Sequence, residues 1–512
     1  MRPFDETGVF RRTADGDALQ RLAVRGATVT VLSQSLAFAI QMIATVILAR
    51  LLTPADFGLL AMVSTFSLLL MNFGPIGFTE AVLQREEIDH ALASNLFWIN
   101  LSLGLLLTIG FAAAGPLLAR FYGDPRVAPV AVTMSVTIFF SSVSVQHLAL
   151  LKRAMRFSAL STNDILARAL SVAVSILLGW KAWGYWALVA GAVTLPLSTS
   201  IGAWTLCRWV PGLPRHVVGT VPMVRFAINT YGRFVLNYFR HNLDNLLVGW
   251  RFGPQPLGIY KKAYDLFVLP SSSLTDPLTN VAVSTLSRLT RDSAQYGRYF
   301  LRALSAIAFV GMGLGAGLTL MADDLILVIL GPGWEESARI FRFLGPGVGI
   351  MMLYGTHGWI HLSIGRADRW LRWAAVEFTV TGLLFLAGLR WGLAGIAVAW
   401  VASYWILTIP AFLYAGRPAR LGIAPVIGAV WKYALASALA GYTAALVVHG
   451  STSLATASGP MGAISRIVTT SALFGALYLC AVTFVHRGRA PFSQIAGLLR
   501  DMTPGGRFSR SS

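Results

Sequence analysis

The polar residues best placed for chemistry lie in one long, mostly apolar stretch, residues 225–265. Its first half is long enough to cross a bilayer, which takes about 20 residues. At about 100° per residue, five of its polar side chains fall on one helical face: Arg233, Asn237, Arg240, His241 and Asp244. A charge at membrane depth costs a few kcal/mol or more, so this face should line a bundle interior or a wet cavity. The sequence therefore predicts a polar chamber whose wall is net cationic, which favours an anionic ligand.

The composition around this stretch is that of a polytopic membrane protein. Of 512 residues, 55% are hydrophobic and only 12% are charged, and the mean hydropathy is +0.65. The apolar residues come in runs of about 20 along the whole chain, which indicates helices rather than the short alternating segments of a β-barrel. No signal-peptide pattern precedes the first run, so we interpret that run as a retained span. The two cysteines, Cys207 and Cys480, imply no disulfide framework.

Hydropathy predicts an all-α protein with about fourteen membrane spans, each of about 18–26 residues. The expected limits are 28–49, 57–78, 91–118, 127–148, 160–180, 183–206, 226–250, 265–286, 300–321, 340–362, 371–389, 391–414, 425–449 and 463–485. The net charge of +19 comes from basic residues in alternate short loops and in both tails. The positive-inside rule explains this pattern more simply than nucleic-acid binding, and it places both termini in the cytoplasm. Arg251, Lys261 and Lys262 break the rule on the predicted outer side, where they either attract an anion or snorkel at the interface.

An internal repeat organises these spans. Residues 49–59 resemble residues 249–259, with a proline and a glycine at the same offset, and Trp183-Gly184 and Trp391-Gly392 recur at almost that spacing. The repeat predicts two parallel six-helix lobes, with substrate sites between them near the membrane midplane. The expected divisions are a cytoplasmic tail 1–27, an N-lobe 28–207, a linker 208–225, a C-lobe 226–415, two extra spans within 425–486 and a cytoplasmic tail 487–512.

Several stretches also resemble a known family: LARLLTPADFGLLAMV at 48–63, FWINLSLGLLL at 97–107, ARFYGDPRV at 119–127 and HNLDNLLVGWRFGPQPLGIYKKAYDLFVLP at 241–270. They resemble the polysaccharide-exporting flippases of the multidrug/oligosaccharidyl-lipid/polysaccharide (MOP) superfamily, in particular the Wzx-type, colanic-acid-exporter-like branch. The resemblance implies a V-shaped, MATE-like transporter of the bacterial inner membrane. It implies that a polyprenyl-pyrophosphate-linked oligosaccharide repeat unit crosses to the periplasmic leaflet by alternating access, for exopolysaccharide, capsule or O-antigen assembly. His241 departs from the arginine expected at that position, and so does Trp250-Arg251 from an arginine followed by an apolar residue.

The implied substrate assigns roles to the polar helix. Arg233 and Arg240 are candidate pyrophosphate ligands, because the guanidinium group is a planar, permanently charged fork. Asn237 and Asn242 are candidates for hydrogen bonds to sugar hydroxyls. Asp244 either joins this site or pairs with Arg240 four residues earlier. His241 either senses protons near neutral pH or makes an ordinary hydrogen bond.

Other membrane-embedded polar groups leave two interpretations open. Gln34 and Gln41 in the first span, the repeat mate of the seventh, either line the pathway or bond to neighbouring helices. Glu377, Asp265 and Asp164 are candidates for ion coupling. Asp164 also lies four residues before Arg168, and Glu377 five residues after Arg372, so either acid could instead form a structural ion pair.

The outer residues Trp334, Glu335 and Glu336 either touch an emerging sugar or mark the interface.

The sequence contains no Walker A loop and no clustered metal-ligand motif, so we expect a transporter with no cofactor beyond a coupling proton or sodium ion. The expected partners are the lipid-linked oligosaccharide, membrane lipids, a polysaccharide polymerase and export machinery, and no nucleic acid. Two other functions remain open. A multidrug or cation antiporter of the same superfamily should carry acids in its cavity, and a membrane-embedded polysaccharide polymerase should carry a large external loop.

Overall fold

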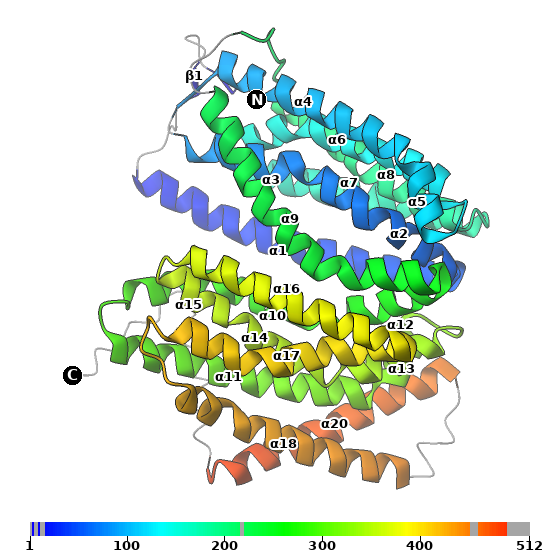
Figure 1. Cartoon of the computed structure of the whole chain (residues 1–512), viewed down its shortest axis with the longest axis vertical. Coiled ribbons are helices and arrows are strands. Elements are labelled where there is room, and N and C mark those ends of the chain that lie inside the picture. The colour runs from blue at the N-terminus through cyan, green and yellow to red at the C-terminus, as the bar shows by residue number, and fades with distance from the viewer. Residues whose placement is uncertain are drawn as a thin grey trace. The chain divides into compact units, whose positions relative to one another are not determined.

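In the computed structural model, the described part of the chain comprises residues 3–4, 9–10, 16–85, 87–215, 220–450 and 459–488. Nearly all of these residues are helical (Figure 1). Their contacts define two compact units, Met1–Lys261 and Lys262–Ser512, and each unit is described by itself. The sequence divides the chain before the polar helix instead, and those lobe limits remain a prediction.

The first unit contains nine helices and one short strand pair among its described residues. The helices are α1 (Gly16–Leu51), α2 (Pro54–Met71), α3 (Phe73–Gln84), α4 (His90–Ala113), α5 (Gly115–Tyr122), α6 (Val127–Arg153), α7 (Phe157–Trp180), α8 (Tyr185–Cys207) and α9 (Thr220–Phe252). The antiparallel strands are β1 (Val9–Phe10) and β2 (Ile88–Asp89). Helix α10 (Pro254–Arg288) begins in this unit and continues into the second.

The second unit is also built from helices. They are α11 (Ser293–Leu320), α12 (Ala322–Ile329), α13 (Glu335–Leu344), α14 (Gly347–Gly355), α15 (His357–Ser363), α16 (Ala367–Gly388), the 3-10 turn η1 (Leu389–Trp391), α17 (Gly392–Gly416), α18 (Ile423–Gly450) and α20 (Gly459–Val485). The last two helices pack on α11 and α12, where Arg466 of α20 forms an ion pair with Asp324 at 2.6 Å. The hydroxyl of Tyr478 also donates to the carbonyl of Phe309 at 2.7 Å.

Ten stretches within the described residues are long and apolar enough to cross a membrane. Six of them coincide with the first six predicted spans, and one stretch of 49 residues, Asp368–Gly416, holds both α16 and α17. The prediction of an all-α polytopic protein is confirmed, whereas the number fourteen remains a prediction. The span predicted at 340–362 is interrupted between α13 and α14, where Pro346 lacks a backbone N–H for the helical ladder.

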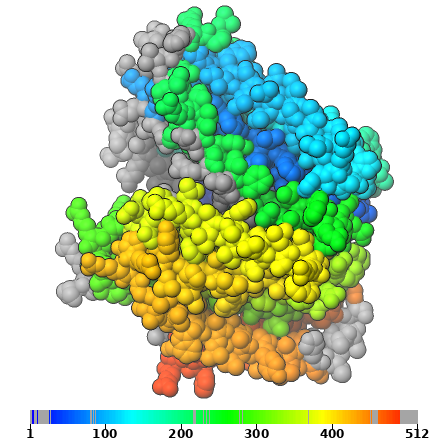
Figure 2. All heavy atoms as spheres, viewed as in Figure 1, coloured from blue at the N-terminus to red at the C-terminus, as the bar shows by residue number. Residues whose placement is uncertain are grey.

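The surface of the second unit fits a lipid environment. Large apolar side chains are exposed along α16 and α17, including Leu383, Leu386, Trp405 and Ile406. These two helices contribute to the yellow and orange surface that faces the viewer in Figure 2. In water such a surface would be an aggregation hazard, but in a bilayer it is the solvated face.

The local sequence explains where α2, α8 and α17 begin. Pro54 is the first residue of α2, a position where its missing N–H costs nothing, and Thr53 and Asp56 form a capping box around it. Gly184 and Gly392, from the second repeat correspondence, stand at the start of α8 and α17 with φ of +56° and +69°. A glycine adopts this backbone without the penalty that a Cβ would bring.

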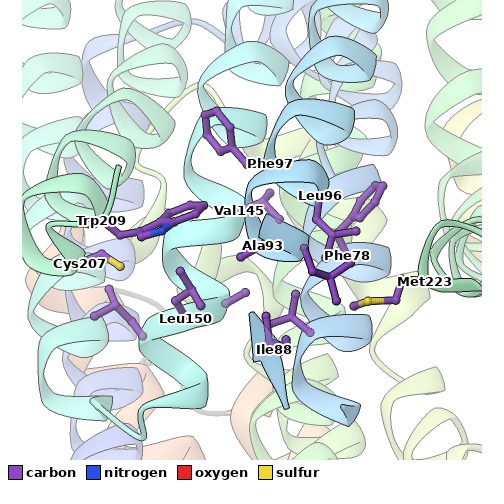
Figure 3. Close-up of a cluster of buried hydrophobic side chains, with 14 of the residues drawn as sticks. Phe78, Ile88, Ala93, Leu96, Phe97, Val145, Leu150, Cys207, Trp209 and Met223 are labelled. Carbon is purple, nitrogen blue, oxygen red and sulfur yellow. The ribbon is translucent and has the colours of Figure 1, made fainter. Parts of the chain in front are cut away.

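The buried core of the first unit joins the ends of several helices (Figure 3). Its members come from α3, β2, α4, α6, α8 and α9 and from the segment after α8: Phe78, Ile88, Leu96, Phe97, Val145, Leu150, Cys207, Trp209 and Met223. Met223 and Ala227 bring the first turns of α9 into this core. The polar helix is therefore anchored by apolar packing at its N-terminal end.

Candidate functional site

The polar helix exists as one continuous element. Helix α9 runs without a break for 33 residues and lies beside α2 and α3 (Figure 1). The side chains of Arg233, Asn237 and Arg240 lie outside the described part of the structure. Their assignment as substrate ligands therefore remains a prediction, supported by a helical backbone at all three positions.

Two tyrosines fix which face of α9 packs against its neighbour. The hydroxyl of Tyr231 donates to the carbonyl oxygen of Leu69 at 2.7 Å, and that of Tyr238 donates to the carbonyl oxygen of Thr65 at 2.8 Å. Tyr231 also packs edge-on against Phe73, with ring centroids 4.7 Å apart. These contacts define the face of α9 that covers α2 and α3.

The predicted cationic face lies on a different side of the same helix. Positions 233 and 240 each follow one of the two tyrosines by two residues, which is a rotation of about 200° on a helix. The cationic positions therefore belong to a face roughly opposite the one that packs on α2. The two tyrosine contacts were not predicted from the sequence, although the spacing of seven residues between Tyr231 and Tyr238 places both on one face of a helix.

The C-terminal end of the predicted polar face is closed. Asp244 is 0% exposed, and its carboxylate accepts a hydrogen bond from the hydroxyl of Tyr260 on α10 at 2.8 Å. His241, one turn earlier, is half-buried. Asn242 donates to the carbonyl oxygen of its own-helix neighbour Tyr238 at 2.9 Å. At this end of α9, the polar side chains therefore make contacts within the protein.

The candidate residues on α1 are accessible. Gln34 and Gln41 are both exposed. The alternative interpretation, in which buried amides bond between helices, therefore does not describe them. Large apolar side chains of the same helix, including Val31 and Phe38, are exposed as well, so a role of the two glutamines in lining the pathway remains a prediction.

The three candidate coupling acids differ in their surroundings. Asp164 forms the ion pair with Arg168, at 2.9 Å, that their spacing predicts. Asp265 is exposed on α10. Glu377 is 5% exposed on α16, while Arg372 pairs with Asp368 at 3.5 Å. Of the three acids, Glu377 is the one buried in the membrane-spanning part of its unit.

The outer acidic region has a different structure from the one expected. Trp334 is 1% exposed, so neither a sugar contact nor an interfacial position describes it, because its ring is part of the core. The backbone N–H of Gly333 donates to Glu335 at 2.9 Å, and this hydrogen bond lowers the pKa of that carboxyl. A pocket of about 350 Å³ lies nearby and is lined by Asp323, Asp324, Glu335, Arg466 and apolar side chains.

The two copies of the outer repeat motif touch each other through glycine. A Cβ built on Gly58 would overlap the carbonyl of Pro254, and a Cβ built on Gly258 would overlap the carbonyl of Pro54. The same hypothetical Cβ atoms would lie 2.9 Å from the amide nitrogen of Gly258 and 3.0 Å from that of Gly58. The contact is reciprocal at an offset of 200 residues. The repeat was visible in the sequence, but its direct self-contact was not.

Solved structures identify the class of protein that this fold defines. The fold is similar to that of the lipid II flippase MurJ in an inward closed conformation, with a TM-score of 0.71 and 13% identity over 91% of this chain and 99% of that one. It is also similar to an inward-facing multidrug resistance MATE family transporter of the MOP superfamily, with a TM-score of 0.61 and 13% identity over 75% of this chain and 94% of that one. The protein therefore has the all-α membrane fold shared by these transporters.

The family follows from the sequence match. The family model described as "Polysaccharide biosynthesis protein" matches residues 47–339, more than half of the chain, and the chain belongs to this family. The family match confirms the resemblance to polysaccharide exporters that the sequence motifs indicate.

Three relatives are similar over most of their length. The teichuronic acid biosynthesis protein TuaB of Bacillus subtilis (strain 168) is 26% identical, over 66% of this chain and 70% of that protein. The lipopolysaccharide biosynthesis protein WzxC of Escherichia coli (strain K12) is 21% identical, over 81% and 84% respectively. The succinoglycan biosynthesis transport protein ExoT of Rhizobium meliloti (strain 1021) is 22% identical, over 69% and 71%.

Proposed function

We propose that this protein is a flippase that moves a polyprenyl-pyrophosphate-linked oligosaccharide repeat unit across the bacterial inner membrane by alternating access. Both termini lie in the cytoplasm, and the delivered unit is consumed by a polysaccharide polymerase on the outer side. The family and the MurJ-like fold support lipid-linked saccharides as the substrate class. A sugar and a pyrophosphate cannot cross hydrocarbon unaided, so the protein must supply a polar, cationic path.

The observation that carries this proposal is the construction of α9. Tyr231 and Tyr238 hold one face of the helix on α2, and the sequence puts two arginines and an asparagine on a different face. Arginine at membrane depth is costly unless it meets an anion or water, so a face with Arg233 and Arg240 suits pyrophosphate. The exposed amides of Gln34 and Gln41 supply uncharged partners for sugar hydroxyls.

Alternating access needs a closure that opens and re-forms. The reciprocal contact of Gly58 and Gly258 is suited to this role, because bare backbone meets bare backbone with no side chains to unlock. It follows the first and the seventh predicted spans, which puts it on the predicted outer side. Glu377, buried on α16, is the candidate group for proton or sodium coupling.

The test is complementation of a flippase-deleted strain with wild-type protein, with Arg233→Ala, with Arg240→Ala and with the double variant. Arg225→Ala is the matched control, because Arg225 is an exposed arginine at the start of the same helix. Membrane levels are measured by blotting, and lipid-linked repeat units are scored by leaflet.

We expect the double variant to accumulate at the normal level, to lose export and to trap the lipid-linked unit on the cytoplasmic side. Arg225→Ala should export normally. Full export by the double variant would remove the pyrophosphate site from α9. Export of glycan with no change in the leaflet distribution of the lipid intermediate would remove the flippase proposal itself.

A further inference from the structure

The linker that leads into α9 is held along α4 by its backbone. The imidazole Nε2 of His90 lies 3.3 Å from the carbonyl oxygen of Val210, and the indole N–H of Trp98 donates to the carbonyl oxygen of Gly212 at 2.8 Å. The amide of Gly212 in turn donates to the hydroxyl of Ser94 at 2.9 Å. One face of α4 thus binds the chain between α8 and α9 through main-chain hydrogen bonds.

Asn95 completes this row with two bonds to one residue. Its carbonyl oxygen accepts the amide of Arg215 at 2.9 Å, and its side-chain amide donates to the carbonyl oxygen of Arg215. The same amide lies 3.4 Å from the hydroxyl of Thr220, the first residue of α9. Asn95 therefore binds the linker at Arg215 and also contacts the first residue of the polar helix.

The N-terminal segment binds to the same anchor. The ring of Phe4 packs edge-on against His90, with ring centroids 5.3 Å apart, and lies 6.1 Å from Trp209 at the head of the linker. It also contacts Phe10 at 6.3 Å. Phe4 therefore covers both the α4 residue that binds the linker and the first aromatic residue of the linker itself.

A short strand pair holds Val9 and Phe10 beside the start of α4. In β1, Val9 pairs with Asp89 and Phe10 with Ile88 of β2, directly before α4. Phe10 is 6% exposed, and the guanidinium of Arg153, at the end of α6, lies over its ring at 5.3 Å. Arg153 also donates to the carbonyl oxygen of Val82 at 2.9 Å. The segment thus joins the ends of α3, α4 and α6 to the linker.

We propose that Phe4 and β1 form an N-terminal latch that holds the α8–α9 linker against α4. Docking of the latch buries the ring of Phe10 and half-buries that of Phe4, and the apolar area of the two rings makes them effective anchors. While it is docked, the linker backbone stays paired with α4 and the start of α9 stays fixed. Release of the latch frees the linker and lets α9 move relative to α4. This device is independent of the substrate that the protein carries.

The test uses trypsin on the full-length protein in detergent or nanodiscs. Arg208 and Arg215 are exposed linker residues, but cleavage after Arg215 requires its backbone to leave Asn95. Cleavage of a transiently opened site tracks the population of the open form. Arg291, in the turn between α10 and α11, supplies an internal reference site.

The variants are Phe4→Ala, Phe10→Ala and the double variant, with Asn95→Ala as the direct disruption of linker binding. Phe484→Ala, at an exposed phenylalanine of α20, is the matched control. We expect the double variant to speed cleavage after Arg215 by about tenfold, because each lost ring shifts the open population. Cleavage after Arg291 should not change, and Phe484→Ala should match the wild type.

Phe4→Ala alone carries the test if the double variant does not accumulate, because Phe4 is half-buried at the edge of the apolar cluster and contacts the rings of Phe10, His90 and Trp209. A Phe4→Leu variant should restore most of the protection. Equal cleavage after Arg215 in wild type and Phe4→Ala, with faster cleavage in Asn95→Ala, would overturn the latch. The result is read without any transport assay, so it stands apart from the proposed function.

Discussion

The first residues of α2 and of α10 are two copies of one sequence motif, but the N-termini of the two helices are capped in different ways. Both place a proline at the first helical position and a glycine four residues later, and both of these residues take part in the reciprocal contact. In the first copy, Thr53 and Asp56 cap the helix, with both the amide and the hydroxyl of Thr53 donating to the Asp56 carboxylate. In the second copy, the position that corresponds to Thr53 is Gly253, which has a φ of +86°.

The difference separates what the contact requires from what the helix start requires. Where backbone meets backbone, the copies agree, because only glycine leaves room for the opposite carbonyl. At the position before each proline, the copies differ. Thr53 caps α2 with a polar side chain, whereas Gly253 precedes α10 in a left-handed backbone conformation. The second copy has Pro256 in place of Asp56 and so carries no charge there. Variants that separate these two requirements test the comparison.

The largest effect should come from the glycines of the contact. We expect Gly58→Ala or Gly258→Ala to lower the free energy of unfolding by about 2 kcal/mol or more, because a Cβ would overlap a carbonyl that belongs to another helix backbone. The measurement is thermal unfolding of the purified protein in detergent. Gly232→Ala on α9 is the control, because a Cβ there meets nothing within 4 Å. Equal unfolding midpoints for Gly58→Ala and Gly232→Ala would contradict a tight contact.

The sequence predicted this region in part. The proline and glycine offsets indicated a repeat, and the apolar runs gave the first six spans within a few residues. The contact between the copies could not be predicted, because periodicity describes one helix and says nothing of its neighbour across 200 residues. The burial of Trp334 was also not predicted, because it depends on contacts between helices. From sequence alone, a tryptophan near the predicted outer end of a span is expected at the membrane interface.

The candidate site was predicted less completely than the fold. A polar stripe every three or four residues is recognisable in a sequence, so a helix was predicted at 226–250, and α9 extends beyond that range at both ends, from Thr220 to Phe252. Which stripe residues contact protein was not readable, because Asp244 meets Tyr260 only through the hairpin that folds α10 back. The ion pair of Asp164 and Arg168 was predictable, since both ends lie on one helix at a spacing of four.

The two caps should show the next effect in size. Gly253→Ala should lower the free energy of unfolding by about 1–2 kcal/mol, because its positive φ is unfavourable for a residue with a Cβ. Thr53→Ala should cost about 1 kcal/mol, the usual value of a lost N-cap. Thr53→Gly should recover part of that loss, since glycine is itself an accepted cap residue. Chemical or thermal unfolding of the three variants measures the series, and a larger loss in Thr53→Gly than in Thr53→Ala would argue against interchangeable caps.

The helices that precede the two copies, α1 and α9, also differ in their contacts. Tyr231 and Tyr238 of α9 bond to α2, whereas the residues 200 positions earlier on α1, Val31 and Phe38, are exposed. Tyr231→Phe and Tyr238→Phe should each lower the free energy of unfolding by about 0.5–1.5 kcal/mol, since each removes one hydrogen bond and little volume.

Tyr442→Phe is the control for both tyrosine variants, because Tyr442 is exposed on α18. Thermal unfolding is again the measurement. If the two α9 variants behave like Tyr442→Phe, then α9 is held on α2 by apolar packing, and the asymmetry between the two copies is smaller than the hydrogen bonds indicate.

The smallest effect should be a dependence on pH that only the first copy has. The guanidinium of Arg126 donates to the carboxylate of Asp124 at 2.7 Å, and this bond lowers the pKa of Asp124 in the folded protein. The negative charge of Asp56 in the first copy also attracts Arg126, whereas Pro256 offers no charge in the second.

Because the folded pKa is depressed, the stabilisation is present above the unfolded pKa of about 3.9 and is lost as pH falls through that value toward the folded pKa. The change should be no more than about 1 kcal/mol, since Arg126 is half-exposed. Unfolding midpoints measured from pH 6 down to pH 3 should fall less steeply in Asp124→Asn than in wild type. A wild-type slope that this variant leaves unchanged would place the acid sensitivity elsewhere in the chain. The contact between Gly58 and Gly258, which both copies share, would then be the main stabilising feature of the region where α2 and α10 begin.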